Sequence, residues 1–394
     1  MAQALLGNDV PRVYTPPLRE LTPETTLGYA FAEFCDDRGT PLLPWQDWLG
    51  KHMLELLPNG TFRFRTVILL VARQNGKSTF AQLLALFFMF IIEVPLILST
   101  AQNLDIAEEV WQGGVDMVEG DEELIQHKVR VVQQRGSKAL ELDNGARWKV
   151  QAATRRGGRG LSGDLVMMDE LREHQTWEAW SAISKTTMAR DNAMVFALSN
   201  AGDMTSIVLR HLRMQAHKAL GDPDGLWVDP HTGEPIVEEE ITDLDEDELP
   251  DDESLGIFEW SARPDRSVRD RAGWQEANPS LGYTITEKAI RAALASDPEW
   301  TFRTEVLCQW SATTLETVFP TGTWEKGTDP ESAFAPGPVM YGVDVSWDRN
   351  QTYISAASLR ADGKVHVEVV AARPGLEWVI PWLESKKRAH APAG

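Results

Sequence analysis

The sequence predicts an α/β protein with a parallel β-sheet that helices cover on both faces. Three observations predict this class. Apolar runs of strand length alternate with longer helical patterns from residue 66 to residue 118. One apolar run, 67–71, leads into Gly76-Lys77-Ser78, and another, 165–168, ends in two carboxylates. Continuous apolar runs of this length are typical of strands that are buried on both faces, as in a parallel sheet.

The segment before this alternation is predicted to contain an extended arm and two helices. Residues 1–25 are rich in Pro and Thr, which favours the arm, and residues 29–35 have a short helical pattern. The second helix starts in Leu43-Pro44-Trp45-Gln46. Apolar residues then recur on one helical face, at Trp45, Trp48, Leu49 and Met53.

The residues Arg73, Gln74, Asn75, Gly76, Lys77, Ser78 and Thr79 are predicted to form a phosphate-binding loop, followed by a helix at 80–92. Gly76 lets backbone amides approach a phosphate, and Lys77 supplies a positive charge. Ser78 or Thr79 supplies a hydroxyl ligand for Mg²⁺. The loop departs from the usual pattern at its start, where Val71 occupies the first glycine position. Alone, Gly-Lys-Ser is also compatible with a chance surface turn.

The carboxylates after the strand at 165–168 are the predicted second half of the site. A carboxylate at the end of such a strand can hold Mg²⁺, directly or through water, and we assign this role to Asp169. A neighbouring carboxylate can polarise the attacking water, and we assign this role to Glu170. The alternative is an ordinary strand followed by a polar loop.

The remaining elements follow in order. Asp143-Asn144-Gly145 predicts a hairpin turn, because Asn-Gly between alternating strands favours one. Further strands are expected at 95–99, 139–142, 147–150 and 193–198, and helices at 104–118, 177–187, 207–220, 286–296 and 298–309. A loop rich in Gly and Arg spans 154–163, and an acidic loop spans 221–254. After a linker at 320–338, strands are expected at 339–346, 352–359 and 364–370.

The composition is that of a soluble globular protein whose 394 residues suffice for more than one domain. The formal charge of −21 argues against nonspecific coating of nucleic acid. About half of it comes from eleven acidic residues between Glu238 and Glu253, which are expected to form a solvated loop. Two cysteines, Cys35 and Cys308, predict neither a metal cluster nor a disulfide framework. No secretory signal or membrane span is expected.

In this order and spacing, the motifs between residues 43 and 350 resemble the large subunit of the terminase of tailed double-stranded DNA bacteriophages, the DNA-packaging motor. The family joins a P-loop ATPase of the ASCE/RecA-like class to an RNase H-like nuclease. The resemblance implies an ATPase domain with its arm at 1–210, a helical linker or lid subdomain at 211–320 with the acidic loop at 238–253, and the start of the nuclease at 335–394.

The resemblance also implies residue roles. The family's phosphate loop is similar, with Arg-Gln-x-Gly-Lys-Ser and often no leading glycine. Leu43-Pro44-Trp45-Gln46 resembles its adenine-reading motif, in which the Gln46 amide would bind the base edge. The alternative for Gln46 is a polar residue on a first helical turn. Ser199-Asn200 resembles the coupling motif, which senses loss of the γ-phosphate; the alternative is a strand-end cap.

Arginines are a further part of the resemblance. Arg155, Arg156 and Arg159 lie on the Gly-rich loop, and Arg159 matches best the family's finger that acts on a ring neighbour's nucleotide. The alternatives are contact with the DNA backbone or a solvated loop. Arg73 would face the phosphates from within the phosphate loop and act in cis.

The C-terminal segment resembles only the beginning of the nuclease. Asp344 matches its first metal-binding carboxylate, which would hold Mg²⁺ or Mn²⁺. The family's other ligands lie farther downstream, and Asp348, Asp362 and Glu368 are not assigned as replacements. We therefore expect an incomplete and inactive nuclease in this chain.

The function implied is ATP-driven translocation of double-stranded DNA into a viral procapsid, with ATP and Mg²⁺ at the ATPase site. The implied partners are the portal of the procapsid, the small terminase subunit and further copies in a ring, in the cytoplasm of a bacterial host and without a membrane. Two alternatives remain. One is another P-loop translocase or helicase, which would need a second RecA-like half, and the other is a nucleotide-binding fragment without catalysis.

Overall fold

A computed structural model describes residues 5–101, 104–134, 138–151, 161–203, 205–226, 253–310, 329, 331–345 and 351–389. The chain divides into two compact units, residues 1–316 and 317–394, which are described separately. The predicted boundary near residue 210 therefore falls inside the first unit. The subdivision of this unit into an ATPase domain and a linker subdomain stays a prediction.

The first unit is built on a nine-stranded sheet with the order β1-β9-β2-β8-β7-β3-β6-β5-β4. Its central strands β2 (Thr66–Val71), β8 (Met194–Ser199), β7 (Leu165–Asp169) and β3 (Leu96–Ala101) are parallel to their neighbours. All four lie within two residues of their predicted positions. In a parallel sheet the carboxyl ends of the strands meet at one edge. Three predicted site segments each follow one of these strand ends: the phosphate loop, Asp169-Glu170 and Ser199-Asn200. The fold therefore brings the three segments to the same edge of the sheet.

The predicted hairpin extends one side of the sheet. Strands β5 (Ala139–Leu142) and β6 (Arg147–Val150) pair antiparallel around the Asn-Gly turn, where Gly145 has φ 87°. Strand β6 also runs parallel to β3, and β4 (Lys128–Val132) forms the outer strand next to β5.

The other side of the sheet holds two strands that the sequence analysis missed. Strand β9 (Leu255–Trp260) runs parallel to β2 and begins directly after the acidic loop predicted at 221–254. Strand β1 (Val13–Tyr14) pairs antiparallel with β9, so part of the predicted extended arm belongs to the sheet. The most acidic stretch, 238–252, lies outside the described residues.

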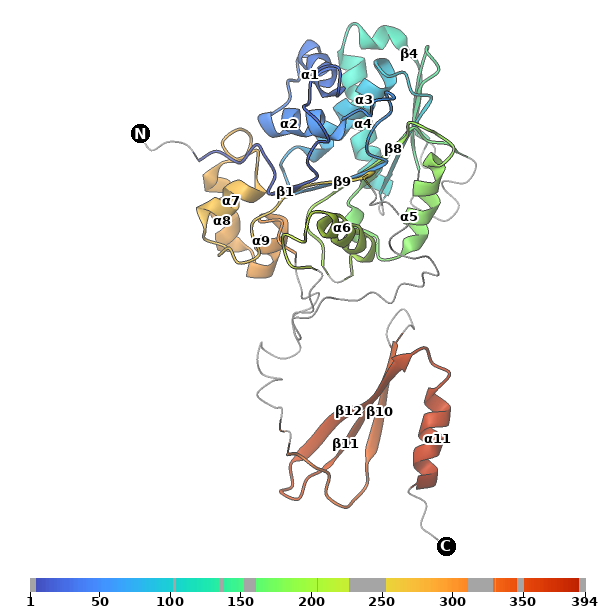
Figure 1. The fold of residues 1–394 in the computed structure, drawn as a ribbon, viewed down its shortest axis with the longest axis vertical. Helices are drawn as coiled ribbons and strands as arrows, with labels where there is room; N and C mark the ends of the chain where they lie inside the picture. Colours follow the sequence, from blue (N-terminus) through green and yellow to red (C-terminus); the bar gives the residue numbers. More distant parts are fainter. Residues whose placement is uncertain are drawn as a thin grey trace. The chain divides into compact units, whose positions relative to one another are not determined.

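Helices cover both faces of the sheet, as predicted (Figure 1). Side chains of α1 (Gly28–Asp37), α2 (Pro44–Met53), α3 (Lys77–Phe90) and α4 (Leu104–Gly120) pack on the face that carries Val67, Leu69 and Val71. Side chains of α5 (Trp177–Ser184), α6 (Ile207–Ala219), α7 (Arg271–Ala277), α8 (Glu287–Ser296) and α9 (Glu299–Glu305) pack on the face that carries Ile68 and Leu70. Alternate residues of β2 therefore face two separate cores, which explains its continuous apolar run.

Several helix bounds differ from the predictions. Helix α3 begins at Lys77 rather than at residue 80, because the phosphate loop feeds directly into it. The helix predicted at 177–187 is α5 followed by a 3₁₀ turn, η3 (Lys185–Thr187). The helix predicted at 298–309 ends earlier, at Glu305, and helix α7 was not predicted. Further 3₁₀ turns are η1 (Leu124–His127) and η2 (Leu171–Glu173). Among the described residues, no helix is both long and apolar enough to cross a bilayer.

The second unit is a three-stranded antiparallel sheet with the order β10-β11-β12. Strands β10 (Met340–Val345), β11 (Gln351–Leu359) and β12 (Val365–Pro374) lie where strands were predicted. Helix α11 (Val379–Ala389) was not predicted. It packs on the sheet through Trp382, whose ring meets that of Tyr341 edge-on at 5.5 Å.

Candidate nucleotide-binding site

The phosphate loop has a backbone conformation that depends on glycine. Gly76 has φ 89°, and a Cβ atom there would lie 3.1 Å from Nε2 of Gln46. Gln74 also has a positive φ, 63°, which is uncommon outside glycine. The loop ends at the first turn of α3, whose backbone amides have no partners within the helix. Such an N-terminus is suited to binding an anion.

The Lys77 side chain lies buried within this loop. Its Nζ donates to the carbonyl oxygens of Val71 at 3.0 Å and Ala72 at 3.4 Å. Burial lowers the pKa of Lys77, because it disfavours the charged form, and the carboxylates of Glu170 and Asp169 oppose this shift. An anion bound beside Lys77 would compensate the buried charge.

Asp169 and Glu170 follow β7 and differ in their surroundings. Burial, and then the charge of Glu170, raise the pKa of Asp169 to about 6, while Lys77 opposes the rise. Asp169 Oδ1 accepts the backbone N–H of Glu170 at 2.9 Å. Glu170 adopts φ 51°, and its buried Oε2 has no hydrogen-bond partner among the described residues. This oxygen lies 3.1 Å from Nε of Arg172. The Glu170 carboxylate therefore forms an ion pair with Arg172 but accepts no hydrogen bond at Oε2 among the described residues.

A cavity of about 570 Å³ joins the predicted residues. This volume lies within the range of about 300–1,000 Å³ that is usual for small-molecule sites. The lining includes eight predicted site residues, which are Gln46, Arg73, Gln74, Gly76, Lys77, Ser78, Thr79 and Glu170. Leu43, from the motif that resembles the adenine-reading motif, also lines the cavity, whereas Pro41 and Thr284 were not predicted.

Gln46 connects helix α2 to the phosphate loop. Its Oε1 accepts the backbone N–H of Leu43 at 2.9 Å, and its Nε2 donates to the Gly76 carbonyl at 3.2 Å. A primary amide has two N–H donors and two oxygen lone pairs, so one of each is left for a ligand. The predicted contact of Gln46 with an adenine edge remains a prediction.

Asn75 takes a different place from its neighbours in the loop. Its side chain is fully buried and is not part of the cavity lining. Its Nδ2 donates to the carbonyls of Ala72 at 3.1 Å and Arg73 at 3.2 Å, and its Oδ1 accepts the backbone N–H of Ser280 at 3.0 Å. The Asn75 side chain therefore supports the loop from behind.

Glu305, at the end of α9, connects three parts of the site. Its carboxylate pairs with Arg73 of the phosphate loop and with Arg172, whose Nη1 lies 2.8 Å away, and it accepts from Asn200 Nδ2 at 2.9 Å. Ser199 Oγ accepts the backbone N–H of Arg172 at 3.2 Å. Neither Arg172 nor Glu305 was predicted as a site residue. The position of Arg172 two residues after Glu170 was a usable signal, whereas no local pattern marks Glu305.

The remaining predicted residues are not part of this constellation. Arg155, Arg156 and Arg159 lie outside the described residues. Asp344 belongs to the second unit, where it is exposed on β10 opposite Tyr353 of β11. In the described part of that unit, no three His, Cys, Asp or Glu side chains come close enough to share a metal ion.

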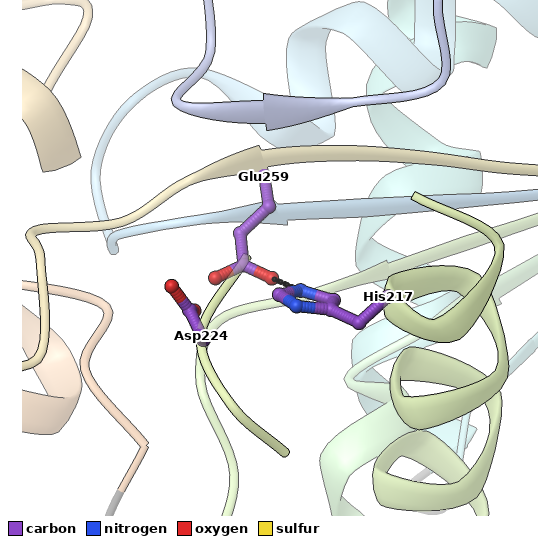
Figure 2. Close-up of side chains that lie close together, drawn as sticks. All are labelled: His217, Asp224 and Glu259. Atoms are coloured by element: carbon purple, nitrogen blue, oxygen red, sulfur yellow. Dashed lines mark hydrogen bonds and ion pairs between the residues drawn. The ribbon is translucent and has the colours of Figure 1, made fainter. Parts of the chain in front are cut away.

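One group of possible metal ligands occurs elsewhere in the first unit. His217 of α6, Asp224 and Glu259 of β9 bring ligand atoms within 4.8 Å of one another (Figure 2). Arg213 donates to Glu259 at 2.7 and 2.8 Å and to Asp224 at 2.8 Å, and Arg12 also pairs with Asp224. Burial alone would raise the pKa of Glu259, but Arg213 and His217 hold it well below its usual value. Two guanidinium groups already neutralise two carboxylates, so we interpret the cluster as a buried ion-pair network.

Comparison with solved structures identifies similar folds. The chain resembles the large terminase of bacteriophage HK97 with a TM-score of 0.57 and 20% identity, over 93% of this chain and 71% of that one. A mutant of the ATPase domain of the Thermus phage P74-26 large terminase matches with a TM-score of 0.47 and 15% identity, over 71% and 98%. No protein-family model and no curated protein sequence matches the chain. The similarity to the HK97 protein confirms the predicted α/β fold of a large terminase.

Proposed function

We propose that this chain is the ATPase of a bacteriophage DNA-packaging motor and drives double-stranded DNA into a procapsid by hydrolysing ATP. The observation that carries the proposal is the cavity in which a phosphate loop, Gln46 and Glu170 meet. These residues come from three separate motifs of the sequence, each of which was predicted to contribute to one ATP site.

The residues of the cavity fit ATP with Mg²⁺. Lys77 and the first turn of α3 offer positive charge and free amides to the phosphates. Gln46, Leu43 and Pro41 form the part of the lining that would face the base. Ser78 and Asp169 would hold Mg²⁺, which when bound neutralises charge on the transferring phosphoryl group.

Hydrolysis requires a base and a positive charge near the γ-phosphate. Glu170 is the proposed base, which orients a water molecule and takes its proton as the water oxygen attacks the γ-phosphorus. The bond from the γ-phosphorus to the bridging β-phosphate oxygen breaks, and ADP leaves with the electron pair of that bond. Arg73 acts in cis and Arg159 from a neighbouring subunit, where a guanidinium stabilises the charge that develops. In the structure Nε of Arg73 pairs with Glu305, and Arg73 also lines the cavity.

Ser199 and Asn200 are proposed to couple hydrolysis to movement of the DNA, and the contact of Asn200 with Glu305 supports this role. Asn200 and Arg73 share Glu305 as a partner, and Glu305 ends α9. If loss of the γ-phosphate moves Arg73, the position of Glu305 changes, and this alters the contacts at the end of β8 and at the end of α9. Duplex DNA, the portal, the small subunit and a ring of identical subunits are the proposed partners. Asp344 is proposed as the first metal ligand of an RNase H-like nuclease.

Steady-state ATP hydrolysis tests this proposal against its alternatives. The wild-type chain should hydrolyse ATP, duplex DNA should stimulate it, and Glu170→Gln should abolish turnover. Stimulation by single strands with strand separation would favour a helicase. Turnover that Glu170→Gln does not reduce, or that duplex DNA does not affect, would contradict the packaging proposal.

A further inference from the structure

The phosphate loop is held by a distant turn at residues 278–282. Ser280 donates its backbone N–H to Asn75 Oδ1 at 3.0 Å and its hydroxyl to the Asn75 carbonyl at 2.9 Å. Asn75 Nδ2 also lies 3.3 Å from Asn278 Oδ1. Both ends of the Asn75 amide and its backbone carbonyl are thus bound by residues about two hundred positions away.

The same serine also contacts helix α2. The Ser280 hydroxyl accepts the indole N–H of Trp45 at 3.0 Å. Trp45, Asn75 and Ser280 are all fully buried. Trp45 precedes Gln46, which lines the cavity. One hydroxyl group therefore connects the phosphate loop to the helix that carries the proposed base-binding residue.

The turn itself is fixed from two sides. Asn278 Nδ2 donates to the carbonyls of Trp274 at 3.1 Å and Val306 at 2.8 Å. On the other side the N-terminal arm packs against it, because the Gly7 N–H donates to the Leu281 carbonyl at 2.8 Å. A Cβ atom on Gly7 would lie 2.0 Å from the Asn278 carbonyl oxygen, so the approach requires glycine. These contacts hold the turn beside the phosphate loop.

We infer that Ser280 is a positioning residue for ATP binding, which holds the phosphate loop in the conformation described above and connects it to α2. The inference rests on the proposed function. The loop needs such support because it lacks the usual first glycine and places Gln74 at φ 63°. A backbone conformation of this kind persists only where surrounding contacts impose it. Ser280 and Asn278 supply these contacts and touch neither Glu170 nor the cavity.

The test is the ATP dependence of hydrolysis, with binding of ATP measured by calorimetry. Ser280→Ala removes two hydrogen bonds, and we expect it to raise Kd and KM for ATP by about tenfold. Because Glu170 and Asp169 are placed by β7, kcat at saturating ATP should stay within about twofold of wild type. Ser280→Thr keeps the hydroxyl and should restore part of the affinity.

Ser99→Ala is the matched control. Ser99 is buried on β3, and its hydroxyl accepts the indole N–H of Trp148 at 2.7 Å, which is the same pair of groups in the same unit. It makes no contact with the phosphate loop among the interactions of the described residues. Ser99→Ala removes one buried hydrogen bond where Ser280→Ala removes two, so it should lower thermal stability somewhat less and leave Kd and KM for ATP unchanged.

The possible results separate this inference from the function on which it rests. If the wild-type chain does not bind ATP, both are wrong. If wild type binds ATP and Ser280→Ala binds it equally well, the positioning role alone is wrong. If Ser280→Ala and Ser99→Ala weaken ATP binding to the same degree, the effect is one of general stability, and the inference is overturned.

Discussion

Replacing Lys77 by Met should separate ligand binding from stability. The ammonium group is buried, and its pKa is lowered chiefly by that burial. When the pKa of a basic group is lower in the folded state than in the unfolded state, the charged group destabilises the fold. The loss of stability is complete at pH values below the folded-state pKa, and it disappears as the pH rises to the unfolded-state pKa. At pH 7, Met removes this cost while it keeps most of the side-chain volume.

The expected magnitudes follow from the contacts of Lys77. The substitution leaves the carbonyls of Val71 and Ala72 without one donor each, which costs about 1 kcal/mol apiece. Loss of the buried charge offsets this, so we expect the free energy of unfolding to stay within about 1 kcal/mol of wild type. ATP loses at least one charge-assisted hydrogen bond, worth about 1.5–3 kcal/mol, so Kd should rise by about 10–100-fold.

Urea unfolding at pH 7 and calorimetric titration with ATP and Mg²⁺ measure the two quantities on the same variant. Unchanged ATP affinity would refute the assignment of the phosphate loop. A loss of more than about 2 kcal/mol in stability would show that the buried ammonium stabilises the fold, contrary to the reasoning from its pKa.

Other predictions concern single residues. Burial raises the Asp169 pKa to about 6, so the charge of Asp169 destabilises the fold increasingly as the pH rises from about 4 to 6. At pH 8 the Asp169→Asn variant should therefore be more stable than wild type, by up to about 3 kcal/mol in chemical unfolding. The same variant should be unable to hydrolyse ATP. Equal stability at pH 8 would contradict the burial argument. Glu170→Gln should bind ATP and lose hydrolysis; wild-type turnover would place the base elsewhere. Arg213→Ala removes a counter-ion that two buried carboxylates share, and should lower the free energy of unfolding by about 3–5 kcal/mol without changing ATP affinity. Arg159→Ala mixed with Glu170→Gln subunits should regain some turnover if the finger acts in trans, and no regain in assembled rings would favour a role in cis or on DNA.

The central sheet could be predicted because local pattern and chemical motif agree there. Strands β2 and β7 combine an apolar run with a motif at the carboxyl end, and each signal supports the other. Strand β9 could not be found in this way, because Glu259 interrupts its apolar run. The charge is tolerated because Arg213, 46 residues away in the chain, pairs with it. A contact over such a distance leaves no local pattern.

The site was predicted in part for a similar reason. A motif states which residues form the phosphate loop, but not the direction of each side chain. Asn75 was predicted as part of the nucleotide-binding loop, and this stays a prediction; its side chain, however, contacts Ser280 rather than the cavity. Ser280 and Glu305 are ordinary polar residues in sequence and gain their roles only from the folding of distant segments onto the loop.

The most direct test of the account is a structure of the chain with Mg²⁺ and a non-hydrolysable ATP analogue. We expect the triphosphate between Lys77 and the first turn of α3, the base beside Gln46 and Leu43, and Asp169 and Ser78 on the metal side. A nucleotide bound outside this cavity, or none at millimolar concentration, would contradict the central claim that the cavity is the ATP site.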